Sequence, residues 1–175
     1  MSNQTKPLTV VTGEVRLHFI KLRPVPGESS SVCALVPKDD TQTVENIKEK
    51  ILAAKEVGKP KWGNKVPQNL IYPLKDGSVK ADKYPEFKDH FYLNAKTKFR
   101  PGIIGPDRQD ILDLDELYNG VYARLSLNVY TYSALGNQGI GFGLVNILKT
   151  RDGPRFAGRD PISDFFDDET EALLA

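Results

Sequence analysis

The sequence predicts a mainly β protein: an OB-like small barrel with one principal α-helix and long loops. Hydrophobic and polar side chains alternate in residues 9–22, 90–99 and 121–131, a period that is typical of half-buried strands. One segment alone, residues 44–57, has hydrophobic residues at helical spacing. A closed barrel suits such a strand set because it leaves no strand edge unpaired. A two-sheet sandwich is the alternative architecture.

The first strand is expected over residues 9–22. Its alternation assigns one face to hydrophobic side chains, namely Val11, Val15, Leu17 and Phe19. The other face then holds Thr12, Glu14, Arg16 and His18. Gly13 interrupts the pattern and predicts a bulge or a sharp bend. A second, buried strand is expected over residues 32–36, ended by Pro37.

The helix follows two aspartates that can act as its N-cap, Asp39 and Asp40. Its hydrophobic face is expected to consist of Val44, Ile47, Ile51 and Ala54. Gly58 is expected to end it. Residues 59–87 then lack a regular pattern and contain four prolines, and a stretch of this length inside a domain is usually functional or disordered.

The remaining strands lie in the second half of the chain. Residues 90–99 are expected to be a strand, 101–106 a turn and 111–118 a short acidic helix. Residues 121–131 have the cleanest alternation, and Gly136-Asn137 predicts a hairpin turn into a return strand over 139–149. The return strand contains Gly139, Gly141 and Gly143, which favour close approach of a strand, a loop or a nucleotide.

The charge distribution divides the chain into three parts. Of 24 basic and 23 acidic residues, the last 16 positions hold six acidic residues and no basic one. We therefore expect a disordered lead-in over residues 1–8, an OB-like nucleic-acid-binding domain over 9–159, and an acidic disordered tail over 160–175. A basic body with an acidic tail is typical of nucleic-acid binding, and a solubilising tail on an ordinary domain is the alternative.

The sequence contains no motif for catalysis. It has one cysteine, Cys33, and two histidines, and it lacks the spacings of hydrolase, zinc-protease and calcium-loop motifs. We expect no enzyme activity, cofactor, metal site or small-molecule substrate. No hydrophobic run is long enough for a membrane span, and the first residues lack the apolar core of a signal peptide, which favours a cytoplasmic location.

Aromatic and basic residues are interleaved on two predicted strand faces. One set is Tyr92, Lys96, Lys98 and Arg100, and the other is Tyr122, Arg124, Tyr130 and Tyr132. Single-stranded nucleic acid needs this combination, because cations offset phosphates while flat rings stack on any base. The alternative is that the tyrosines are strand residues covering a second minor core.

A loop supplies a further candidate site. Trp62 is flanked by three lysines, Lys59, Lys61 and Lys65. The indole can stack on a base, or it can plug the mouth of the barrel.

Several segments resemble a family of phage single-stranded DNA-binding proteins, formerly of unknown function. The similar segments include the pattern V-x-G-x-V-R-L over residues 11–17, Lys61-Trp62-Gly63, Tyr92-Leu93-Asn94-Ala95 and Gly120-Val121-Tyr122-Ala123-Arg124. The resemblance implies an OB fold, an acidic C-terminus and a role in phage DNA replication or recombination. It also implies a cytoplasmic location in an infected bacterial host. Unlike several proteins of this functional type, the chain does not end on an aromatic residue.

The expected function is therefore sequence-independent binding of single-stranded DNA by base stacking and phosphate neutralisation. The acidic tail is expected to contact replication proteins. The alternative is a non-enzymatic phage structural or interaction protein with a β-barrel body. Nothing in the sequence identifies a 2′-hydroxyl reader, so a preference between DNA and RNA stays open.

Overall fold

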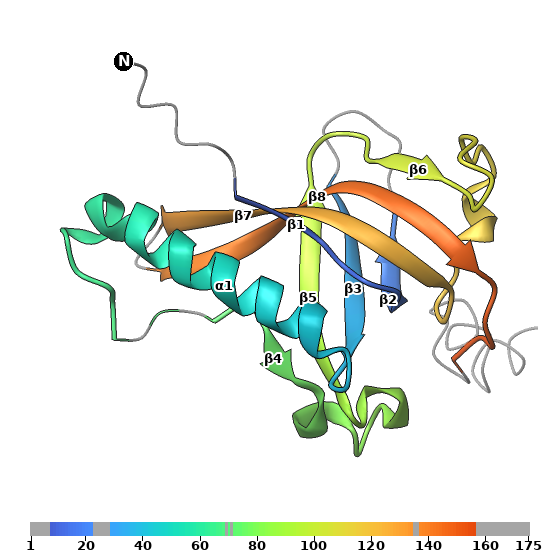
Figure 1. The fold of residues 1–175 in the computed structure, drawn as a ribbon, viewed down its shortest axis with the longest axis horizontal. Helices are drawn as coiled ribbons and strands as arrows, with labels where there is room; N and C mark the ends of the chain where they lie inside the picture. The colour runs from blue at the N-terminus through green and yellow to red at the C-terminus, as the bar shows by residue number, and fades with distance from the viewer. Residues whose placement is uncertain (1–7, 23–28, 69, 71, 135–136, 157–175) are drawn as a thin grey trace, which may run out of the picture.

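Five strands of the described part of the chain close into a barrel, whose arrangement Figure 1 shows. The computed structural model describes residues 8–22, 29–68, 70, 72–134 and 137–156. The barrel strands are β2 (Val15–Lys21), β3 (Ser30–Pro37), β5 (His90–Thr97), β7 (Tyr122–Ala134) and β8 (Asn137–Arg151). They pair in the order β7-β2-β3-β5-β8, and β8 pairs again with β7. This closed ring confirms the mainly β, OB-like barrel expected from the sequence.

One contact in the ring is parallel and short. β5 pairs with β8 through Ala95–Phe142 and Lys96–Gly143, whereas the other four ring contacts are antiparallel. β7 and β8 form the longest pair, from Tyr122–Arg151 to Ala134–Asn137. Because the β7–β8 pairing extends well past the point where β8 meets β5, the two strands continue beyond the ring as a hairpin.

Short elements complete the described fold. β1 (Leu8–Val11) pairs with β7, β4 (Lys75–Asp76) with β5, and β6 (Gly102–Ile104) with β8. The described residues also form four 3₁₀ turns, η1 (Lys59–Trp62), η2 (Gly77–Lys80), η3 (Pro85–Phe87) and η4 (Leu114–Glu116). The expected turn over 101–106 therefore contains a short strand, and the expected acidic helix over 111–118 is a single 3₁₀ turn.

The helix α1 (Thr41–Gly58) connects β3 to β5 and lies across β1 and β7. The Asp40 carboxylate is its N-cap and accepts a hydrogen bond from the Thr43 backbone N–H at 3.2 Å. The four expected face residues are buried. The helix therefore starts and ends as the sequence predicts, with Asp40 rather than Asp39 as its cap.

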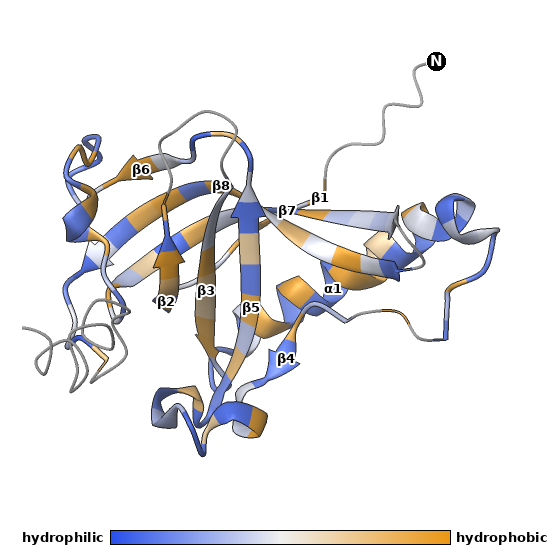
Figure 2. Ribbon diagram, turned by 180° about the vertical axis from the view of Figure 1, so that it is seen from behind, coloured by the Kyte–Doolittle hydropathy of each residue, from blue (hydrophilic) through white to orange (hydrophobic). Residues whose placement is uncertain are grey.

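The core fills the inside of the barrel. From Val121, just before β7, to Val129 within it, every second side chain is buried, as the alternation predicts. Figure 2 shows the same alternation of hydrophobic and hydrophilic residues along β7 and β8. Cys33 is also buried, and burial raises the pKa of its thiol to about 12, which fits a core residue.

The prediction of a single strand over residues 9–22 is wrong in two places. The chain breaks at residues 12–14 into β1 and β2, and Val10 rather than Val11 is buried. At Phe19 the backbone has φ 47°, and the pairing with β3 shifts register between His18 and Lys21. His18 stays on the predicted face, paired with Cys33, but the rings of Phe87 and Phe156 lie over it and it is completely buried. Phe19 stacks on the His18 ring and is 39% exposed, so its side chain leaves the hydrophobic face that the alternation predicts.

The buried His18 ring forms two hydrogen bonds at this irregularity. The His18 Nδ1 accepts from the Phe19 backbone N–H at 2.9 Å, so the proton of the neutral ring is on Nε2, which donates to Glu86 Oε1 at 2.6 Å. Burial lowers the pKa of His18 despite the nearby carboxylate, so the ring stays neutral.

We predict that Asp40→Ala lowers the free energy of unfolding by about 1 kcal/mol, because a backbone N–H at the helix start loses its acceptor. Asp39→Ala is the matched control and should change stability little, since Asp39 is exposed and is not the cap. Urea denaturation measures both. Equal losses in the two variants would contradict the assignment of the cap.

Candidate nucleic-acid interface

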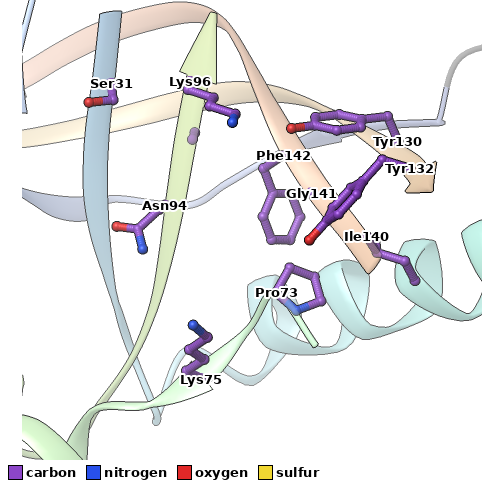
Figure 3. A pocket seen from close by; sticks show the side chains of 11 residues that line it. Ser31, Pro73, Lys75, Asn94, Lys96, Tyr130, Tyr132, Ile140, Gly141 and Phe142 are labelled. Atoms are coloured by element: carbon purple, nitrogen blue, oxygen red, sulfur yellow. The ribbon is translucent and has the colours of Figure 1, made fainter. Parts of the chain in front are cut away.

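A cleft opens where β5 and β8 separate. The two strands pair at only two positions. Next to that contact, β5 pairs with β4 instead, while β8 pairs with β7 in the hairpin. The cleft has a volume of about 490 Å³ and an open mouth. Figure 3 shows its lining, which consists of Ser31, Pro73, Lys75, Asn94, Ala95, Lys96, Tyr130, Tyr132, Ile140, Gly141 and Phe142.

Two tyrosine rings form the hairpin side of the cleft. Tyr130 and Tyr132 are half-buried, and their ring centroids are 6.3 Å apart at an interplanar angle of 49°. They lie on the outward face of β7 and point toward the opening between β8 and the segment that contains Pro73 and Lys75 (Figure 3). Tyrosine suits this place because its ring is apolar and its hydroxyl remains in water.

Glycines on β8 make room for these rings. Tyr130 is paired with Gly141, and Tyr132 with Gly139. A Cβ atom at Gly141 would lie 2.7 Å from the Tyr130 ring, and one at Gly139 would lie within 3 Å of Tyr132. The glycine run therefore serves close approach, as the sequence predicts, and the group that approaches is the tyrosine ring on the neighbouring strand.

Basic side chains lie on the side of the cleft opposite to the two tyrosines. Lys75 and Lys96 line the cleft, and Lys98 and Arg100 follow at the end of β5. All four are exposed, and none of them forms an ion pair with another residue that the structure describes. Four unneutralised cations beside two half-buried rings suit an anionic ligand with flat groups.

Tyr92 does not belong to this site. It is 5% exposed and packs with Cys33, Leu35 and Phe87 in a small outer core. The η2–η3 segment covers this end of the β3–β5 face, while the Ser31–Lys96 end stays open. Tyr92 therefore offers no ring face to a base, and the prediction that it stacks on one is wrong.

Trp62 is likewise unsuited to stacking. It is 7% exposed, lies against Gly58, and its indole N–H donates to the Tyr132 carbonyl at 3.1 Å. The indole therefore packs as a plug beneath the hairpin, one of the two interpretations that the sequence allows. It holds the backbone of Tyr132 from the side opposite to the cleft.

The three lysines of this loop differ in their surroundings. Lys59 pairs with Glu56 at 2.9 Å, and Lys61 donates to the Thr131 carbonyl at 3.0 Å. Lys65 is exposed. None of them lines the cleft.

Tyr122 and Arg124 lie at the far end of β7. Eight residues separate Tyr122 from Tyr130, which corresponds to roughly 27 Å along a strand. The Tyr122 ring is covered by the Arg151 guanidinium at 3.7 Å, and Arg124 donates to the Thr12 carbonyl at 2.9 Å. These contacts hold the strand ends together, so the predicted set does not form one continuous site.

Sequence reasoning missed several lining residues. Lys75 and Pro73 come from the irregular segment, and β4 is only two residues long, too short to produce a pattern. Asn94 also lines the cleft and was not among the predicted site residues. Its neighbour Lys96 was the available signal, because side chains two apart on a strand share a face.

The described part of the chain offers little for other chemistry. Across those residues, no group of three or more His, Cys, Asp and Glu side chains is placed to hold a metal ion. Within the same ranges, no helix has the length and hydropathy needed to cross a bilayer.

Comparison with known proteins identifies the family. The family described as "Enterobacter phage Enc34, ssDNA-binding protein" matches residues 8–173. This chain belongs to that family. No curated protein matches it.

Solved structures of similar fold include single-stranded DNA-binding proteins of two phages. The single-stranded DNA-binding protein of bacteriophage Enc34 in complex with ssDNA is 23% identical, with a TM-score of 0.74 over 85% of this chain and 89% of that one. Without ssDNA, the Enc34 protein is 24% identical, with a TM-score of 0.73 over 91% and 90%. The gp2.5 single-stranded DNA-binding protein of bacteriophage T7 is 10% identical, with a TM-score of 0.64 over 91% and 95%. At these identities the matches show a shared fold.

We predict that Gly141→Ala displaces the Tyr130 ring, because the new methyl group would occupy its place. Stability should change by less than about 1 kcal/mol, since the half-buried ring can swing outward. Gly143→Ala is the control, because its nearest neighbour would be 3.6 Å away, an ordinary contact. Contacts between the Tyr130 ring and residue 141 in an NMR spectrum should disappear in the first variant and persist in the second. Their persistence in both would show that the glycine is not needed.

Proposed function

We propose that the protein binds single-stranded DNA in the cleft between β5 and the β7–β8 hairpin, without regard to base sequence. The observation that carries the proposal is the cleft itself, which places Tyr130 and Tyr132 on one side and Lys75 and Lys96 on the other. Its family membership supports this assignment. So does its fold, which it shares with a protein whose structure contains ssDNA.

The rings supply affinity that does not depend on the base. Every base has a flat face, and stacking on an aromatic side chain is worth about 1–3 kcal/mol per base. The location supports such a role, because the outward face of the second and third strands and the hairpin loop is the usual binding surface of an OB barrel. Here those strands correspond to β3 and β5, and the hairpin is β7–β8.

The Tyr130 hydroxyl does not repel the phosphates. Burial, together with the neighbouring Tyr132, raises the pKa of Tyr130, so the phenol stays neutral at physiological pH. Lys75 and Lys96 then meet the backbone from the other side of the cleft. Asn94 lies between them and Ser31 lies beside Lys96 on β3, and both can donate hydrogen bonds to phosphate oxygens.

In the cell the protein would coat exposed single strands during phage DNA replication or recombination, in the cytoplasm of the infected host, without turning over a substrate. Coating requires only reversible binding, which the stacking and ionic contacts provide. Residues 160–175, which lie outside the described residues, hold six acidic residues that would contact replication proteins.

Tyr130→Ala is expected to weaken binding of oligo-dT by roughly 5-fold to 150-fold, the equivalent of one stacked base. Tyr130→Phe keeps the ring and should retain most of the affinity. Fluorescence polarisation with dT, dA and dC oligonucleotides measures both variants. The loss should be similar for the three sequences, and a loss confined to one base would contradict sequence independence.

Affinity should also fall with salt. Neutralisation of about four phosphates, one for each cation beside the cleft, predicts a slope of about −3 in a plot of log affinity against log salt. Replacing Lys75 and Lys96 by Ala together should reduce the slope by about 1.4. A flat salt response of the unaltered protein would argue against phosphate neutralisation and favour a structural or interaction role.

A further inference from the structure

The loop after β5 carries an aromatic side chain, Phe99, that the fold leaves exposed to solvent. Phe99 is 83% exposed, and its backbone N–H donates to the Thr97 hydroxyl at 3.0 Å, which fixes the turn after the strand. Such exposure of a phenylalanine lowers stability relative to a polar residue, because most of its apolar surface stays in water.

The surroundings of Phe99 differ from those of the other described phenylalanines. Phe19 stacks on the His18 ring and Phe156 contacts the same ring at a tilt. Phe87 contacts several rings, and two lysines lie over Phe91. Phe142 is buried. Phe99 has neither a ring nor a cation over it among the described residues. Both of its faces are therefore available.

The residues next to Phe99 in the sequence suit contact with nucleic acid. Lys98 and Arg100 flank it on both sides, and each is exposed and without an ion-pair partner in the described ranges. Lys96, three residues earlier, lines the cleft. Three residues of chain span at most roughly 11 Å, so the ring lies near the Lys96 end of the cleft.

We propose that Phe99 is a stacking platform for a base outside the cleft, and that Lys98 and Arg100 hold the phosphates on either side of that base. This inference rests on the proposed function and extends it. The binding surface then runs from the Tyr130–Tyr132 cleft along β5 and onto the loop at its end. A strand long enough to leave the cleft reaches Phe99, whereas a strand that only fills the cleft does not.

The test compares two oligonucleotide lengths, since OB folds occupy about 4–16 nucleotides. Phe99→Ala should weaken binding of a dT oligomer of about 16 nucleotides at least roughly fivefold and leave binding of one of about 4 nucleotides unchanged. Phe99→Trp should retain the affinity for the long oligomer, and Phe99→Leu should not, because it is apolar without a ring. The salt slope should be unaltered in Phe99→Ala, since the ring neutralises no phosphate.

Leu112→Ala is the matched control. Leu112 is 84% exposed but precedes Asp113 and lies beyond β6, next to Ile111, so its loss should leave both affinities unchanged. Equal affinity of the unaltered protein and Phe99→Ala for the long oligomer would overturn the inference while leaving the cleft intact. Failure of the unaltered protein to bind either oligomer would instead overturn the proposed function.

Discussion

The two-residue parallel contact between β5 and β8 determines both the barrel and its cleft. It closes the ring, because without Ala95–Phe142 and Lys96–Gly143 the sheet would end at β5. Because this contact is short, the two strands separate next to it, where β5 pairs with β4 and β8 pairs with β7 in the hairpin. A longer contact would bury the surface that the cleft now exposes.

The hairpin side of the cleft depends on different residues in its two strands, β7 and β8. β7 carries the rings, and β8 carries glycines opposite them, so Tyr130 and Tyr132 lie close to the sheet. Trp62 supports the same hairpin from its other side through the Tyr132 carbonyl. The indole thus contributes by fixing the backbone from which a stacking ring projects.

Sequence patterns predicted the parts of the fold that follow a single period. β7 alternates without interruption, and the helix combines a capping aspartate with regular spacing, so both were predicted closely. The pattern failed at Phe19, because a backbone irregularity turns its ring onto that of His18, a residue held by a distant partner, Glu86. It failed again at Tyr92, where the η2–η3 segment covers the ring, and it left open whether Trp62 stacks or is buried. Periodicity states which side a residue faces, but not what lies over it.

The central claim is that single-stranded DNA occupies the open face between β5 and the hairpin. Titration of ¹⁵N-labelled protein with oligo-dT, followed by NMR, tests it directly. We expect amide shifts at residues 94–100 and 139–143, with little change at residues 120–124 and 151–156, where contacts within the protein occupy the side chains. Shifts concentrated at the second group, with none along the cleft, would contradict the claim.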